Sequence, residues 1–189
     1  MRENEKFLSK VVGMLETPRL TPNQKLVLQR AAEASHVCLR LRTPGKGCVP
    51  VSIAFSHGSA ILRKASIPLT ITYTDKFHPA AKRIARIAKQ RSKIIETQER
   101  LTNSDIGDFL QTQNAVWILT GTAPDDGHVF SGFKLNDGHW AIFDTASQSL
   151  ADEQLAYNCG ICDVTDVLKR AELHHNPIFT IVIYCFQNR

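Results

Sequence analysis

The first sixty residues carry apolar side chains at helical spacing. Residues 7–15 form one apolar helix face, and Pro18 ends that segment. The pair Thr21-Pro22 is typical of a helix start, and the apolar positions after it predict a second helix. After a turn-forming stretch at 43–47, residues 48–62 are apolar or small, which predicts a helix buried on most sides.

The middle of the chain predicts one strand and two more helices. Residues 67–73 alternate and are rich in β-branched side chains, as in a strand. Residues 78–100 have the pattern of a long basic helix. Residues 102–111 predict a shorter helix with Asp105 in its first turn, where a negative charge is favourable.

The second half of the chain changes to strand patterning. Strand composition recurs at 115–121, 129–135, 139–145 and 178–186. Asn136-Asp137-Gly138 lies between the second and third of these segments and is a strong hairpin signal. A helix at 164–173 should precede the last strand. We therefore expect an α+β fold in which helices come first and pack on an antiparallel sheet, which argues against a doubly wound parallel fold.

Length and composition agree with this expectation. The chain has 189 residues, 43% hydrophobic and 22% charged, which fits one compact core. We expect an N-terminal helical extension at 1–40 and a single compact unit at 41–189. The longest apolar run, at 178–186, is far shorter than the ~18 to 20 residues that span a bilayer. The first ten residues also lack the apolar core of a secretory signal.

Cysteine usage and charge bear on compartment and partner. Five cysteines, an odd number in a chain that needs no crosslinks, predict a reducing compartment: the cytoplasm, or a second cell that the protein enters without a cleavable signal. The formal net charge is +5, and its positive residues concentrate at 76–100. The favoured interpretation of this segment is a solvated amphipathic helix packed on the core. As a binding surface it would select an acidic protein or peptide substrate or a membrane surface, and nucleic acid is the less favoured partner.

Cys48 is the first candidate for chemistry. It follows a Gly-rich turn and opens the apolar helix in the run Gly47-Cys48-Val49-Pro50. Unpaired amide groups and the positive end of the helix dipole favour a thiolate at this place, and the thiolate is the nucleophilic form of cysteine. The alternative to a catalytic role is that Cys48 packs as a small buried hydrophobic residue, which is the commoner role of a free cysteine.

His128 and Asp144 are the second candidates. His128 begins one strand of the predicted hairpin and Asp144 ends the other, so the two side chains should lie within reach of a hydrogen bond. A Cys-His-Asp set would let His128 accept the thiol proton while Asp144 fixes the imidazole. Taken singly, His128 is more often a polar residue that closes a turn, and Asp144 is more often a strand-end cap or turn former, than either is catalytic.

These residues together resemble a known family. The run Gly-Cys-Val-Pro-Val-Ser-Ile-Ala at 47–54 is similar to the nucleophile helix of papain-like cysteine peptidases of the bacteriocin-processing type. Gly127-His128 and the later Asp144 also fall in the order of that family, and the resemblance covers about residues 45–155. It implies a papain-like fold with Cys48 as nucleophile, His128 as general base and acid, and Asp144 as the orienting carboxylate. It implies no cofactor.

Two positions depart from the family pattern. Arg42 stands where the family has a Gln that helps to stabilise the oxyanion, a donor worth about 3 to 4 kcal/mol in the transition state. Arg42 itself, Lys46 or a donor from elsewhere would have to replace it. Thr145 stands where a Pro is usual. These departures leave deamidation and acyl transfer open beside peptide cleavage, because all three need the same activated thiol.

Two other catalytic sets are open. His139-Trp140 also resembles the start of a catalytic strand in cysteine peptidases, with Asp152 or a later residue as its carboxylate. In the second set, Gln154 and Cys159-Gly160 resemble the signature of ubiquitin-like-protein and adenoviral proteases, with His128 and Asp144 preceding the cysteine. The following segment at 163–173 is amphipathic and charged, unlike a buried nucleophile helix, which counts against this order.

Cys159 and Cys162 raise the question of metal binding, and the basic segment raises that of a non-enzymatic role. Cys159 and Cys162 would need two more ligands for a zinc site, and His174-His175 are adjacent, so two reduced cysteines in a loop are favoured. We expect no metal and no cofactor. The alternative to an enzyme is an adaptor or nucleic-acid-binding protein that uses the basic helix at 78–100.

Overall fold

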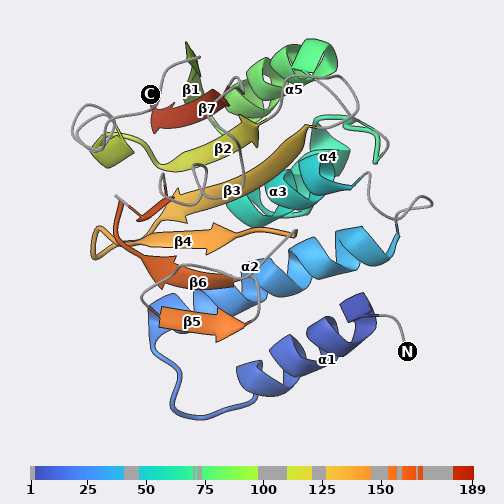
Figure 1. Ribbon diagram of the computed structural model, residues 1–189, viewed down its shortest axis with the longest axis vertical. Helices are drawn as coiled ribbons and strands as arrows, with labels where there is room; N and C mark the ends of the chain where they lie inside the picture. Colours follow the sequence, from blue (N-terminus) through green and yellow to red (C-terminus); the bar gives the residue numbers. More distant parts are fainter. Residues whose placement is uncertain are drawn as a thin grey trace.

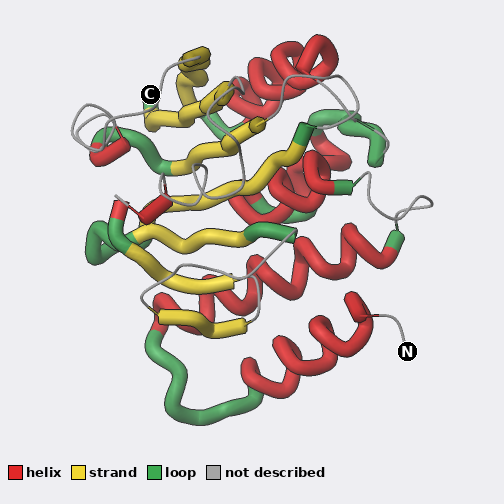
Figure 2. The backbone as a smooth tube through the Cα atoms, in the orientation of Figure 1, coloured by secondary structure: helices red, strands yellow, loops and turns green. Residues whose placement is uncertain are grey.

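The computed structural model describes residues 3–40, 47–69, 71, 74–97, 110–120, 127–145, 153–156, 159–164, 166–167 and 181–189. Helices occupy the first half of the chain and strands the second (Figures 1 and 2). The helices are α1 Glu3–Leu15, α2 Pro22–Leu39, α3 Cys48–His57, α4 Ala60–Lys64 and α5 Thr74–Ile87. The strands are β1 Gln90–Thr97, β2 Ala115–Thr120, β3 His128–Lys134, β4 Trp140–Phe143, β5 Glu153–Ala156, β6 Cys159–Cys162 and β7 Ile181–Asn188.

All the described strands belong to one sheet. Their order is β1-β7-β2-β3-β4-β6-β5, and every neighbouring pair is antiparallel. In Figure 1 β1 lies beside α5 at one end of the sheet, and β5 lies toward α1 at the other. The predicted α+β fold with an antiparallel sheet is therefore confirmed.

The sheet separates two hydrophobic clusters because side chains alternate along each strand. On β2, Trp117 and Leu119 join the cluster that the helices share, whereas Val116 and Ile118 join the cluster on the opposite face. The first cluster is the larger and includes side chains of all five helices. Helix packing on one face of the sheet is thus the main source of apolar burial.

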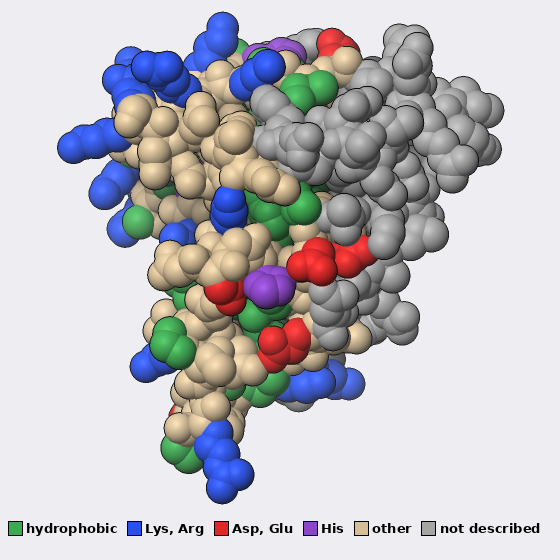
Figure 3. Space-filling view, turned by 90° about the vertical axis from the view of Figure 1, so that its left-hand side faces the viewer, with side chains coloured by type: hydrophobic (Ala, Val, Ile, Leu, Met, Phe, Trp, Pro, Cys, Tyr) green, Lys and Arg blue, Asp and Glu red, His purple; other side chains and the backbone are tan. Residues whose placement is uncertain are grey.

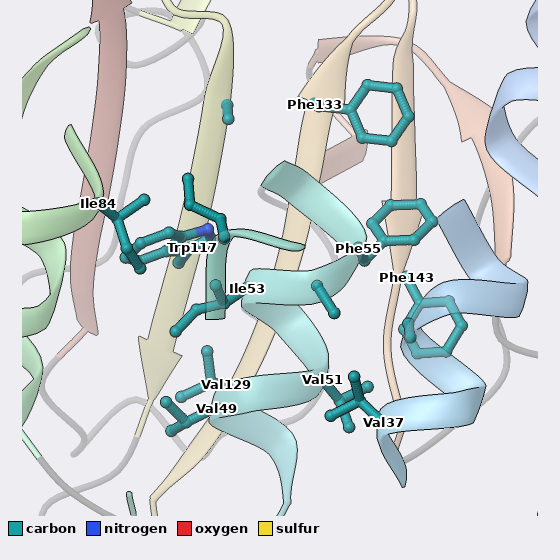
Figure 4. Close-up of a cluster of buried hydrophobic side chains, with 14 of the residues drawn as sticks. Val37, Val49, Val51, Ile53, Phe55, Ile84, Trp117, Val129, Phe133 and Phe143 are labelled. Carbon is teal, nitrogen blue, oxygen red and sulfur yellow. The ribbon is translucent and has the colours of Figure 1, made fainter. Parts of the chain in front are cut away.

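Helix α3 is the centre of this packing. Every residue from Val49 to Ser56 is buried, as expected of a helix that is apolar on all sides. Figure 4 shows α3 with its side chains directed both toward the strands and toward α2. The ring of Phe55 lies 5.2 Å from that of Phe133 on β3 and 5.1 Å from that of Phe143 on β4, measured between centroids. Both strands of the hairpin therefore contact the same helix.

The two predicted N-terminal helices both form. Thr21 caps α2, since its hydroxyl accepts from the Gln24 amide and the Gln24 side chain accepts from the Thr21 amide. From α2, Arg30 donates to the Phe55 carbonyl oxygen at 3.3 Å, and Glu33 accepts from the Ser59 amide at 2.6 Å. Helix α2 thus packs against α3 within the shared cluster. The expected boundary at residue 40 stays a prediction, because residues 41–46 lie outside the described part.

The prediction of one helix over 48–62 is wrong in one respect. α3 ends at His57, and a second short helix, α4, follows. The cause is Gly58, which has a φ of 86° and donates its amide to Ala54 to close the helix.

The prediction of one basic helix over 78–100 is also wrong. α5 ends at Ile87, Lys89 adopts a left-handed φ of 55°, and residues from Gln90 onward form β1. β1 pairs with β7 along its whole length, with Ile94 opposite Tyr184. This pairing with a strand about ninety positions away overrides the helical preference of the local sequence.

Two further expectations differ from the structure. Ile67, Pro68, Leu69 and Ile71 are not in a strand; Ile67 and Ile71 are buried anchors of an irregular connection. Pro68 lacks the amide that a strand ladder needs, which explains the difference. The segment from Cys159 to Cys162 is not a loop but β6, paired with β4 on one side and β5 on the other.

The remaining strands and the hairpin agree with the sequence. β2, β3, β4 and β7 fall within a few residues of their predicted limits. Gly138 has a φ of 92° in the turn between β3 and β4, a conformation that favours glycine. Residues 110–111, 164 and 166–167 are helical, and the rest of the helices expected at 102–111 and 164–173 lies outside the described residues. Within the described part, no helix is long and apolar enough to cross a membrane.

Candidate active site

Cys48 lies at the first position of α3, as predicted. Gly47 precedes it as the N-cap, and the Val51 amide closes the first turn by donating to the Gly47 carbonyl oxygen at 3.2 Å. Pro50 occupies the first turn, where its missing amide costs no helical hydrogen bond. The sulfur is partly buried and lies at the positive end of the helix dipole.

The strands bring His128 and Asp144 together. Ser131 lies opposite Phe143 in the β3–β4 register, so the next residue, Asp144, falls opposite Phe130 and diagonally across from His128. The Nε2 atom of His128 is 2.6 Å from the Oδ1 atom of Asp144. The Asp144 side chain is 1% exposed and that of His128 18%. The predicted proximity of these two residues is confirmed.

Helix α3 places Cys48 against the same histidine. Burial alone would raise the pKa of the Cys48 thiol. The hydrogen bond and charge of His128, together with main-chain hydrogen bonds from Val129 and Val49, outweigh burial and bring this pKa below its ordinary value. The Cys48 sulfur therefore has three hydrogen-bond partners from two elements, His128 and Val129 of β3 and Val49 of α3.

The pKa of His128 shifts in the opposite direction, upward. Burial acts to lower the pKa of His128, but hydrogen bonds to Asp144 and Cys48 and the negative charges of both raise it to about 9. Because Nε2 faces Asp144, Nδ1 is the ring nitrogen left for the thiol. The arrangement thus favours the imidazolium form of His128 at neutral pH and shifts the Cys48 thiol toward the thiolate, with the Asp144 carboxylate as the second partner of the ring.

The other cysteines have different environments. Cys159, Cys162 and Cys185 are buried in strands. Burial raises the pKa of Cys38 and of Cys159, and it raises that of Cys185 to about 12. A raised pKa keeps a thiol protonated and unreactive.

Among the described residues, neither of the two alternative catalytic sets shows a comparable geometry. His139 is 47% exposed and lies 3.2 Å from Asp137 and 3.6 Å from Asp163, on the outside of the hairpin. Asp152, its expected carboxylate, lies outside the described residues. Cys159 lies on β6 opposite Phe143, and Gln154 on β5 opposite Gly160. A fully buried thiol in a strand that is paired on both sides is a poor candidate for a nucleophile.

The side-chain oxyanion donor is not identified by the structure. Arg42 and Lys46, the two candidates from the sequence, lie outside the described residues. Among the residues that are described, no group of three or more His, Cys, Asp or Glu side chains is arranged to hold a metal ion.

The sequence did not predict the hydrogen bond between α3 and β3. Ser52 donates its hydroxyl to the Val129 carbonyl oxygen at 3.1 Å, next to the histidine. The available signal was the spacing of Cys48 and Ser52, which are four apart and so share a helix face. A main-chain partner such as Val129 leaves no trace in the sequence.

The positive charge gathers at the end of the molecule formed by α5 and β1. Figure 3 shows Lys and Arg side chains clustered there, and acidic side chains beside a histidine lower on the same face. The exposed basic residues of the segment are Lys82, Arg83, Arg86, Lys89, Arg91 and Lys93. They lie on helix α5, on the turn that contains Lys89 and on the edge strand β1, and not along one helix as the sequence predicted.

Comparison of the chain with family models, with curated proteins and with solved structures finds no match. The contacts among Cys48, His128 and Asp144 define the candidate site.

Proposed function

We propose that this protein is a papain-like thiol hydrolase or transferase that acts on an amide bond of a protein or peptide. The observation that carries the proposal is the continuous set of contacts from the Cys48 sulfur through the His128 ring to the buried Asp144 carboxylate. Nucleophile, base and orienting group are the three parts that such catalysis requires. The buried helix on an antiparallel sheet supports the papain-like interpretation.

The residues have distinct roles in the proposed reaction. The Cys48 thiolate attacks the carbonyl carbon of the amide and forms a tetrahedral intermediate. The His128 imidazolium then gives its proton to the departing nitrogen, the C–N bond breaks, and a thioester with Cys48 remains. His128 next takes a proton from water or from an acceptor amine, which attacks the thioester; the C–S bond then breaks, and the Cys48 thiolate and the His128 imidazolium are restored.

Helix α3 supplies part of the electrostatic stabilisation. The amide of Cys48 belongs to the unpaired first turn of the helix and is positioned to donate to the oxyanion of the intermediate. Asp144 keeps the His128 ring oriented and stabilises its charged form. Water as acceptor gives peptide cleavage or side-chain deamidation, and an amine as acceptor gives acyl transfer.

Product analysis tests this function. The protein is incubated with a mixture of folded and unfolded proteins, with and without a primary amine, and the products are mapped by mass spectrometry. We expect new peptide termini, conversion of Gln or Asn to the acid, or amine addition, and we expect all of these to vanish with Cys48→Ala. Products that persist unchanged with Cys48→Ala would contradict the proposal.

A further inference from the structure

Ser52 joins the helix of the candidate nucleophile to the strand of the candidate base. Its side chain is buried on α3, 1% exposed, and its hydroxyl donates to the Val129 carbonyl oxygen at 3.1 Å. Val129 directly follows His128 on β3. One polar contact thus connects the two elements immediately beside the site.

The main-chain groups of Val129 point away from β2. The Lys134 amide donates to the Asn114 carbonyl oxygen, on the β2 side, and the Leu135 amide donates to the His139 carbonyl oxygen, on the β4 side, each at 2.8 Å. Main-chain groups alternate between the two edges of a strand, and the N–H and C=O of one residue share an edge. Val129 and Leu135 are an even number of positions apart along the chain, so the N–H and C=O groups of Val129 point to the β4 side, like the amide of Leu135.

Strand β4 does not extend to Val129. The β3–β4 register ends with Ser131 opposite Phe143, two residues before Val129 is reached. Helix α3 supplies partners at this place: Ser52 donates to the Val129 carbonyl, and the Cys48 sulfur accepts from the Val129 amide. Cys48 and Ser52 are one helical turn apart, which matches the contact of both with a single strand residue.

From this arrangement we infer that Ser52 is a positioning residue, which holds the start of β3, and with it His128, in the register that pairs the histidine with Cys48. The inference rests on the proposed function and adds to it the residue that sets the thiol-imidazole contact. Loss of the hydroxyl leaves a buried carbonyl without this donor, so the strand start can shift away from the sulfur. The thiolate then loses both the Val129 amide and the imidazolium.

The test is the pH dependence of Cys48 alkylation by iodoacetamide in the full chain, read from the Cys48 peptide by mass spectrometry. For Ser52→Ala we expect a higher midpoint than in the parent protein and a rate near pH 6.5 that is about tenfold lower. Ser35→Ala is the matched control, because the Ser35 hydroxyl is also buried and donates to a carbonyl oxygen, that of Ala31, but within α2. It should reproduce the parent profile.

Other outcomes decide the inference equally clearly. A Ser52→Ala profile that overlays the parent overturns the positioning role while leaving the proposed function intact. A parent protein whose Cys48 is unreactive overturns the proposed function itself. If Cys159 and Cys185 also react with the reagent in Ser52→Ala, the substitution has loosened the fold. In that case Ser52→Thr, which keeps the hydroxyl donor, tests the positioning role instead. A folded Ser52→Thr protein with the parent midpoint supports the inference, and one with a raised midpoint overturns it.

Discussion

Replacing His128 by alanine should slow the alkylation of Cys48 near pH 6.5 by about a hundredfold or more. His128 supplies a hydrogen bond and a positive charge to the sulfur, and these contributions oppose the burial that raises the thiol pKa. Without them the pKa of Cys48 should rise toward that of the other buried thiols, so the reactive thiolate becomes a minor species. The rate of iodoacetamide incorporation into the Cys48 peptide measures the change.

His139→Ala is the control for this experiment. His139 is 47% exposed and engages Asp137 and Asp163, away from the sulfur, so its loss should leave the Cys48 rate unchanged. The comparison also separates the two histidines that the sequence offered as bases. Equal rates in the His128→Ala and parent proteins, or slowing by His139→Ala instead, would contradict the assignment of His128.

The stability of the fold should fall by about 3 kcal/mol between pH 7 and pH 4 because of His57. Its Nδ1 atom is 2.8 Å from the Ser56 hydroxyl and its Nε2 atom 3.1 Å from the Gln90 side-chain oxygen. Its ring packs edge-on against Trp117 and Phe186. Burial, with a smaller effect of the Arg30 charge, outweighs the Gln90 hydrogen bond and lowers the pKa of His57 to about 4.

His57 binds a proton more weakly in the folded protein than in the unfolded chain. Above pH 6.5 the ring is neutral in both states, whereas between pH 6.5 and 4 the unfolded chain takes up a proton that the folded protein does not. Acid therefore favours unfolding through this group. The contribution of His128, whose pKa is raised to about 9, is present below pH 6.5 and is lost progressively as the pH rises from 6.5 to about 9.

Urea unfolding at several pH values measures the effect, with His57→Gln as the matched variant that does not titrate. The difference between the unfolding free energies of the parent and variant proteins should shift by about 3 kcal/mol from pH 7 to pH 4. This amount is a large part of the 5 to 15 kcal/mol typical of a domain. A difference that stays constant over this range would contradict the account of His57.

The parts of the site that depend on local signals could be predicted from the sequence. A glycine turn before an apolar run places Cys48 at a helix start, and Asn136-Asp137-Gly138 forms a hairpin that sets His128 near Asp144. Both patterns act through neighbours in the chain. The α+β class follows similarly from the order of helical and strand patterns.

The parts that depend on distant pairing could not be predicted. Gln90–Thr97 has residues that suit a helix and becomes β1 only because β7 pairs with it. The sequence of Cys159–Cys162 predicts a loop, but the segment forms a strand because it pairs with β4. The contact of Ser52 with the Val129 carbonyl depends on where β4 stops, which no local pattern encodes.

The central claim is that Cys48 is an activated thiol, and the most direct test compares the iodoacetamide rate constants of all five cysteines in the folded protein near pH 6. Cys48 should react far faster than Cys38, Cys159, Cys162 and Cys185, because its environment alone combines a helix start with an imidazolium partner. Equally slow labelling of all five, or preferential labelling of Cys159, would contradict the account.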